Sequence, residues 1–329
     1  ANGGLGRWTS ASGNTMNVGQ GYIVRGPSNF DDASPQNLTV NFTGAKQNNG
    51  LITVPIARGA MEPSTMGSYV GVNSTLLTFN DDNWNLVGNP YPSAIRALDF
   101  LNANTNIEGA VRLWTHGTLP VSATNPFYGT YQYNYTSGDY ITHNGTGTVS
   151  GPAGFNGYIA AGQAFFVLMN DGPATSSTVQ FNNTMRSRTY NNAQFYRNGN
   201  EMTTSENETV SHRIWLDIVN SNDQPVRALI GYVDGATLAK DRIYDAYGPV
   251  VNTLNIYSLI DDENMSIQGR PNPFDVNDKV QIGVRIPSQG NYTIAIAALD
   301  GIFATNQNVY LEDKQLNVIH DLKLEPYFF

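Results

Sequence analysis

Short apolar stretches alternate with polar turn residues along most of the chain. The alternation is clearest in the last third, in "HRIWLDIV" (212–219) and "VQIGVRI" (280–286), where apolar side chains recur at every second position. This period is typical of β-strands that bury one face, because successive side chains of a strand point to opposite faces. With "VRALIGYV", "NIYSLI", "NYTIAIAAL" and "QNVYLED", it predicts a β-sandwich of about seven or eight strands.

Helical periodicity is confined to two short stretches. From Ser93 to Leu101, apolar side chains recur at helical spacing, and Ser93 is a residue type that caps the first turn of a helix. A weaker pattern runs from Ala236 to Ala246. The predicted fold class is therefore mainly β, with tandem β-sandwich or jelly-roll-like modules and one or two short helices.

Two stretches of the chain resemble each other. The stretch "MNVGQGYIV" (16–24) matches the pattern of "IAAGQAFFV" (159–167), and a Val-x-Phe strand follows each about twenty residues later. The simplest explanation is a repeated β module whose first copy is truncated. The alternative is that Gly-Gln is a common turn before an apolar strand.

These patterns divide the chain into four parts. Residues 1–50 are predicted to be the C-terminal part of a truncated β module, and residues 51–190 a complete module. Residues 191–205 are poor in large aliphatic side chains and are predicted to be a linker. Residues 206–329 are the predicted C-terminal sandwich. The chain as a whole is expected to be an internal or C-terminal piece of a longer protein.

The triplet Asn-Pro-aromatic recurs, at Asn89-Pro90-Tyr91 (extended by Pro92), Asn125-Pro126-Phe127 and Asn272-Pro273-Phe274. Proline pushes the residue before it out of the helical region, so Asn89 and Tyr91 are expected to be extended between a strand and the predicted helix. Tyr91 would then plug the end of the module, and Asn89 would bond nearby backbone. We interpret the triplets as structural corners, with a binding loop as the alternative.

Composition and charge argue against several classes of function for this chain. The chain has 329 residues and a formal net charge of −9, with 14% charged and 11% aromatic residues. No lysine and arginine cluster marks a nucleic-acid surface, and no apolar run approaches a membrane span, so neither nucleic-acid binding nor direct membrane insertion is expected. The absence of cysteine excludes disulfides, thiolate catalysis and cysteine-ligated zinc.

The sequence carries no catalytic motif. The histidines are scattered along the chain, at His116, His143, His212 and His320. Neither a Gly-x-Ser-x-Gly elbow nor a phosphate-binding loop occurs, so the chain is expected not to be an enzyme and to need no cofactor. A structural calcium ion is the one metal considered, because sandwich loops often supply oxygen ligands. Its candidate ligands are Asp275, Asn277 and Asp278.

A row of tyrosines is the candidate ligand-binding feature. Tyr131, Tyr133 and Tyr135 alternate and would share one face of a strand, with Tyr140 shortly after them. An exposed row of this kind stacks on sugar rings, which makes surface polysaccharide a candidate partner. The alternative is that these tyrosines pack on the module, since aromatic residues are favoured in strands in any case.

Several of these stretches resemble a known family. The segments "NWNLVGNPYPSAI", "GQGYIVRGP" and "AGQAFFV" resemble modules of large exported proteins of Bacteroidetes. The segments "HRIWLDI", "DVNDKVQIGVRIPSQGNYTIAI" and the final "PYFF" resemble the sandwich that precedes the C-terminal sorting domain in those proteins. The resemblance covers nearly the whole chain and carries over no catalytic residue.

The resemblance implies a cargo of the type IX secretion system. Proteins of this kind are adhesin-like, including those of gliding bacteria, and lie on the outer-membrane cell surface. The implied partners are the type IX translocon and its outer-membrane shuttle proteins, which would be reached through a downstream sorting domain. The expected function is a non-enzymatic structural or adhesin segment. The alternatives are a carbohydrate-binding module and an accessory domain of a secreted hydrolase.

Overall fold

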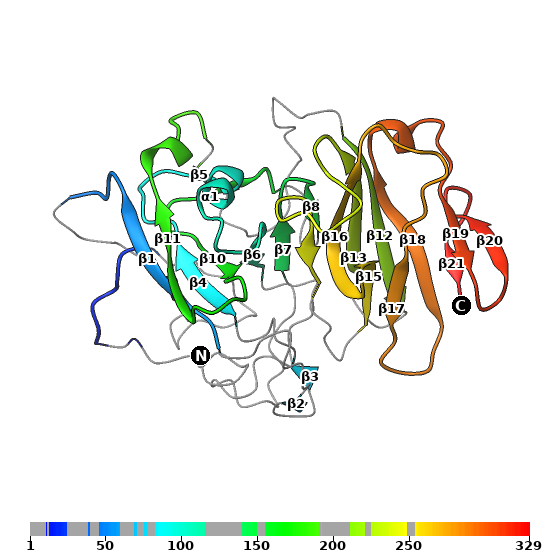
Figure 1. Ribbon diagram of the computed structural model, residues 1–329, viewed down its shortest axis with the longest axis horizontal. Coiled ribbons are helices and arrows are strands. Elements are labelled where there is room, and N and C mark those ends of the chain that lie inside the picture. Colours follow the sequence, from blue (N-terminus) through cyan, green and yellow to red (C-terminus); the bar gives the residue numbers. More distant parts are fainter. Residues whose placement is uncertain are drawn as a thin grey trace.

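The computed structural model describes residues 11, 13–24, 39, 46–59, 69–70, 76–77, 83–115, 140–149, 155–190, 192, 211–220, 225–248 and 254–329. Within these residues the chain is mainly β, with one α-helix and several sheets, which confirms the predicted fold class. Figure 1 shows two β-rich units beside each other along the long axis. We call the described part of residues 13–190 the first unit and that of residues 211–329 the second unit.

The first unit is built on a five-stranded antiparallel sheet with the order β4-β10-β6-β7-β8. Two ribbons, β1–β11 and β5–β9, accompany it, and helix α1 packs beside β11 (Figure 1). The bounds are β1 (Ile52–Ala57), β4 (Trp84–Gly88), β5 (Ile95–Arg96), α1 (Ala97–Ala103), β6 (Val111–Trp114), β7 (Tyr140–His143), β8 (Thr148–Val149), β9 (Tyr158–Ile159), β10 (Ala164–Leu168) and β11 (Ser176–Phe181). A separate pair consists of β2 (Tyr69–Val70) and β3 (Leu76–Leu77).

The core of the first unit lies between the five-stranded sheet, the β1–β11 ribbon and helix α1. Phe100 of the helix meets Phe165 of β10 edge to face, with ring centroids 5.1 Å apart, and lies 4.9 Å from the ring of Phe181 of β11. All three rings are fully buried. Apolar residues of strand and helix thus form one cluster, as expected for a layered domain.

The predicted start of the helix is wrong. Helix α1 begins at Ala97, its N-cap is Arg96, and no side chain caps it. Ile95 and Arg96 instead pair with β9, and the buried Ser93 hydroxyl has no hydrogen-bond partner in the described part of the chain. Leu98 and Leu101 lie in the helix as the spacing predicts, but Ile95 lies in β5, because strand pairing takes the predicted first turn. Tertiary context here overrides local propensity.

The two similar stretches flank the same strand. The Gly88 amide donates to the Gly19 carbonyl (2.8 Å) and the Gly21 amide to the Leu86 carbonyl (3.0 Å), while β10 pairs with the opposite edge of β4. Gly19 and Gly162 share a left-handed conformation, with φ of 76° and 70°, which glycine adopts without steric cost. The Gly-Gln pairs of the two similar stretches thus form the same kind of turn. Residues 19–21 adjoin the sheet of the first unit, across the boundary predicted at residue 50.

The second unit contains a mixed sheet with the order β17-β15-β16-β13-β12-β18-β21, and β14 also pairs with β16. Strands β13 and β16 are parallel, whereas the other pairs are antiparallel. A hairpin, β19–β20, lies at the end of the molecule (Figure 1). The bounds are β12 (His212–Asn220), β13 (Val226–Val233), β14 (Ala246–Tyr247), β15 (Asn255–Ile260), β16 (Glu263–Pro271), β17 (Ile282–Arg285), β18 (Tyr292–Leu299), β19 (Tyr310–Asp313), β20 (Val318–Asp321) and β21 (Tyr327–Phe328).

The weaker helical pattern of residues 236–246 is also wrong. This stretch forms turns that lead into β14. The Thr237 amide donates to the Asp241 carboxylate (2.5 Å), and the Asp241 amide donates to the Asp245 carboxylate (2.5 Å). Such side-chain bonds give the backbone an alternative to the helical pattern. We call residues 234–247 the junction loop, because it lies between the two units.

The second unit has its own core on one face of its sheet. Tyr232 of β13, Phe274 and Phe303 form its aromatic centre. The ring centroids of Tyr232 and Phe274 are 4.7 Å apart, and those of Phe274 and Phe303 are 5.1 Å apart.

No helix among the described residues is long and apolar enough to cross a membrane.

Candidate functional site

The candidate functional site is the junction between the two units. Strand β8 of the first unit packs against β13 and β16 of the second. A separate apolar cluster spans this contact, with Ala110, Val149, Leu229, Ala246 and Ile267 buried and Trp215 packed against them. Strand β13 is therefore covered on both faces, by its own core on one side and by the first unit on the other.

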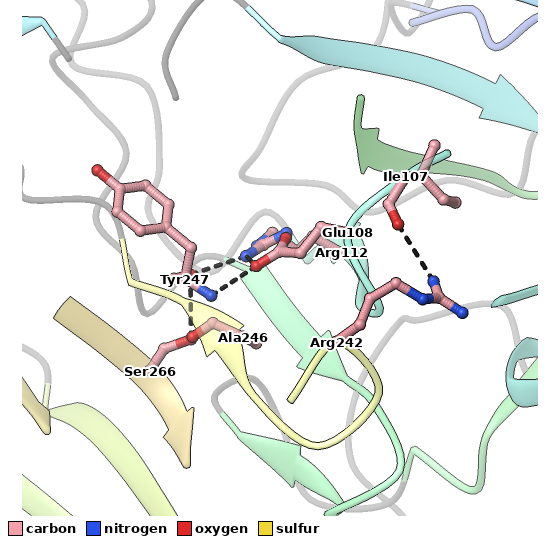
Figure 2. A network of polar contacts seen from close by, with 7 residues as sticks. All are labelled: Ile107, Glu108, Arg112, Arg242, Ala246, Tyr247 and Ser266. Carbon is pink, nitrogen blue, oxygen red and sulfur yellow. Dashed lines mark hydrogen bonds and ion pairs between the residues drawn. The ribbon is translucent and has the colours of Figure 1, made fainter. Parts of the chain in front are cut away.

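A buried ion pair of the first unit holds the backbone of the second (Figure 2). Glu108 and Arg112 pair at 2.5 Å, with side-chain exposures of 11% and 4%. The Tyr247 amide donates to Glu108 (2.6 Å), and Arg112 donates to the Tyr247 carbonyl (2.7 Å). Both polar groups of one β14 residue are thus bound by a single ion pair. A buried pair of this kind fixes geometry more than it adds stability.

Arg242 of the junction loop binds the end of helix α1. Its guanidinium donates to the carbonyls of Leu101 (2.9 Å) and Ile107 (3.1 Å). The Leu101 carbonyl also accepts the amide of the C-cap residue Asn104 (3.3 Å). Arg242 therefore adds a second donor from the second unit at this helix end, where the helix dipole favours positive charge. Burial lowers the pKa of Arg242. Figure 2 shows this arginine beside the Glu108–Arg112 pair.

Glycines allow the junction loop to approach the first unit closely. A Cβ on Gly109 would lie 1.7 Å from the Arg242 carbonyl oxygen, and one on Gly145 would lie 2.7 Å from the Ile243 side chain. The Gly145 amide donates to the Ile243 carbonyl (2.8 Å) and the Thr146 hydroxyl to the Tyr244 carbonyl (2.7 Å). At Gly109 the nearest atoms are all backbone atoms of the junction loop, so the contact there tolerates little change.

The predicted tyrosine row lies mostly outside the described residues, which include Tyr140 but not Tyr131, Tyr133 or Tyr135. Tyr140 is half-buried, and its ring lies 5.9 Å from that of Phe166. The ring of Phe166 in turn meets Trp84 at 6.4 Å, and Arg112 lies over the Trp84 ring at 4.6 Å. These part-exposed rings form an aromatic row across β4, β10 and β7, on the face of the sheet that points away from the core.

The candidate calcium ligands are engaged with protein groups. Asp278 accepts hydrogen bonds from Arg270 (2.9 Å) and from the Tyr232 hydroxyl (2.9 Å). Burial opposes ionisation of Asp278, but these bonds outweigh it and lower its pKa. Asp275 accepts from the Asn277 amide (2.9 Å) within a tight turn. An arginine already neutralises Asp278, so the arrangement is that of a paired carboxylate. No group of three or more His, Cys, Asp or Glu side chains suited to a metal ion occurs in the described part of the chain.

The first corner is a packed structural element. The Asn89 amide group donates to the carbonyls of Ile159 (3.1 Å) and Ala160 (3.0 Å), and its oxygen accepts from the Tyr91 amide (3.1 Å). Tyr91 is 2% exposed, and burial raises the pKa of its phenol against the opposing charge of Arg186. The Asn89 side chain thus ties the Asn89-Pro90-Tyr91-Pro92 segment to β9, and the chain bends from Tyr91 onward.

The second corner, at residues 272–274, also packs against the body of its unit. At Asn272-Pro273-Phe274, the Asn272 amide donates to Asp234 (2.7 Å), and the Phe274 ring packs in the core of the second unit. The triplet at residues 125–127 lies outside the described residues.

The histidines are not brought together in the described part of the chain, which excludes His116. The Nδ1 atom of His143 lies 2.7 Å from the Thr148 hydroxyl, and its buried Nε2 atom has no hydrogen-bond partner among the described residues. Burial, followed by the charges of Arg213 and Arg96, lowers the pKa of His143 to about 3. His143 is therefore a neutral packing residue at neutral pH. The Nε2 atom of His320 contacts a backbone carbonyl, and Nδ1 of His212 accepts from a backbone amide.

The junction was not anticipated from the sequence, although one signal was present. The strand "VRALIGYV" is an almost unbroken apolar run, which is typical of strands covered on both faces. Glu108, Arg112 and Arg242 give no such signal, because the groups that they bind across the junction lie more than a hundred residues away along the chain.

Comparison with known proteins identifies a family and nothing beyond it. A family model described as a domain of unknown function (DUF8693) matches residues 1–329. No curated protein and no solved structure matches the chain. One model thus spans both units and the segment between them.

Proposed function

The chain belongs to the DUF8693 family, whose description states no function, and we propose from its own features that it is a non-enzymatic structural segment of an exported bacterial cell-surface protein. It would be adhesin-like and carried by the type IX secretion system, as its resemblance to large exported proteins of Bacteroidetes implies. In this role it connects other parts of the protein to the cell surface and holds them at a fixed spacing.

The observation that carries the proposal is that described segments from the early and late parts of the chain lie on opposite sides of the junction. Residues 13–24 and β1 lie at one end of the molecule, and β19–β21 lie at the other (Figure 1). A pull applied between these ends passes through the junction. There the Arg242 contacts with helix α1 and the Glu108–Arg112 contacts with Tyr247 cross from unit to unit. A segment that connects two parts of a protein under load needs polar and apolar contacts of this kind between its units.

Surface exposure on cells is the first test of the proposal. Antibodies raised against the isolated chain are expected to label intact cells of the source bacterium, and protease added outside the cells should remove the signal. A strain that lacks the type IX translocon should lose surface labelling and keep the protein inside. Labelling that appears only after lysis of wild-type cells would contradict the proposal, as would unchanged surface labelling in the translocon mutant.

A second candidate function, carbohydrate binding, is favoured by the aromatic row of Trp84, Phe166 and Tyr140. Sugar rings stack on aromatic faces, and the Phe166 ring lies 6.4 Å from the Trp84 ring and 5.9 Å from the Tyr140 ring. Arg112 already covers one face of Trp84, so Phe166 and Tyr140 are the rings offered to a sugar. If this function is correct, the isolated chain should bind polysaccharide prepared from the cell surface, and Tyr140→Ala should remove that binding under conditions in which the variant is still folded. Binding that depends on Tyr140 would place recognition within the chain itself and would replace the purely structural role.

A further inference from the structure

The shape of the junction loop depends on one buried carboxylate. Asp245 is 2% exposed. One of its oxygens accepts from the Gly269 amide of β16 (2.8 Å), and the other accepts from the Asp241 amide (2.5 Å). The residues on either side of it, Tyr244 and Ala246, contact the first unit through the Thr146 hydroxyl and the shared apolar cluster. The carboxylate therefore ties the loop to the second unit while its neighbours hold the first.

The charged side chains around Asp245 do not neutralise its carboxylate. Asp241, on the same loop, opposes its ionisation, and Lys240 favours it, although Lys240 also pairs with Glu263. On β16, which packs against the loop, Arg270 is paired with Asp278 instead. In the described part of the first unit, the side chain that hydrogen-bonds next to Asp245 is the uncharged Thr146, which donates to the Tyr244 carbonyl. Within the described residues, no cation lies within ion-pair distance of Asp245, so its negative charge is held by backbone amides alone.

We propose that the junction loop is a pH-sensitive latch between the two units, in which proton uptake by Asp245 tightens the docked state and proton release loosens it. Burial raises the pKa of Asp245 from 3.8 to about 6, against the amide bonds that lower it. The docked state thus binds a proton more strongly than an opened state in which the carboxylate is solvated. Docking gains stability as pH falls through 6, and the gain is complete below 3.8.

The size of the effect follows from the two pKa values. If opening exposes Asp245 to water, linkage makes the opened state about tenfold rarer at pH 5 than at pH 7. The latch rests on the contacts of Asp245 and not on the proposed surface function. The two ideas therefore stand or fall separately.

Amide hydrogen exchange in the whole chain measures this opening. The Gly145 and Tyr247 amides are suitable reporters, because each donates across the junction, to Ile243 and to Glu108. After correction for the intrinsic pH dependence of exchange, both should exchange about tenfold more slowly at pH 5 than at pH 7. Asp245→Asn should flatten this dependence. Asp234→Asn, which changes an exposed carboxylate at the start of the same loop, should leave it as in the wild type.

Two results would overturn the latch. One is wild-type exchange at these amides that does not change with pH after correction. The other is a pH dependence that survives in Asp245→Asn. A direct carbon-13 NMR titration of Asp245 in the wild-type chain decides the matter even if that variant does not fold. A titration midpoint near 6 supports the latch, and one near the ordinary value of 3.8 rules it out.

Discussion

Gly109→Ala is expected to break the junction. The added Cβ would lie 1.7 Å from the Arg242 carbonyl oxygen and 2.9 Å from the Ile243 Cα, and both are backbone atoms that cannot rotate away. We expect the free energy of unfolding to fall by about 3 kcal/mol, at the upper end of the range for overpacked sites. Chemical denaturation followed by tryptophan fluorescence measures the loss.

Gly290→Ala is the matched control for this prediction. A Cβ at Gly290 meets its nearest neighbour, the Tyr292 ring, at an ordinary 3.7 Å. This variant should stay within about 0.5 kcal/mol of the wild type, as is usual for a surface substitution. Equal stabilities of the Gly109 and Gly290 variants would show that the junction loop does not pack as closely as described.

Tyr91→Ala is expected to destabilise the first unit by about 3–5 kcal/mol, as is usual when a buried aromatic side chain is removed. The Tyr91 ring meets Phe181 edge to face at 6.5 Å and Arg186 at 4.7 Å, and its hydroxyl donates to the Gly50 carbonyl (2.5 Å). The variant thus loses a packed ring and a hydrogen bond together. The midpoint of urea denaturation measures the loss.

Tyr91→Phe separates the two contributions. It keeps the ring and removes only the hydroxyl, so it should cost about 1 kcal/mol. If Tyr91→Ala unfolded like the wild type but lost binding to a surface ligand, the corner would be a binding loop and its structural interpretation would fail.

The sequence predicted features whose causes are local. The prolines at positions 90 and 92 restrict their neighbours, so the corner at Asn89 could be foreseen. The alternating pattern of residues 212–219 likewise revealed β12, because one of its faces meets the core and the other does not. Strand β16 was missed, since its apolar positions are few and interrupted by Glu263, Ser266 and Gln268.

The junction could not be predicted because its determinants are distant in sequence. Arg112 and Glu108 form an i, i+4 pair, which usually indicates the surface of a helix, yet here they bind the backbone of a residue 135 or more positions away. Arg242 looked like part of a weak helix and instead completes the end of helix α1. Only the apolar run of β13 indicated a second covered face, and it did not indicate the partner.

Differential scanning calorimetry of the whole wild-type chain tests the central claim, which is that the junction joins the two units into one cooperative body. The ratio of calorimetric to van't Hoff enthalpy reports whether the whole chain unfolds at once. We predict a single transition with a ratio near one for the wild type. Two separate transitions in the wild type would contradict the account, because the units would then be independent domains that merely lie side by side.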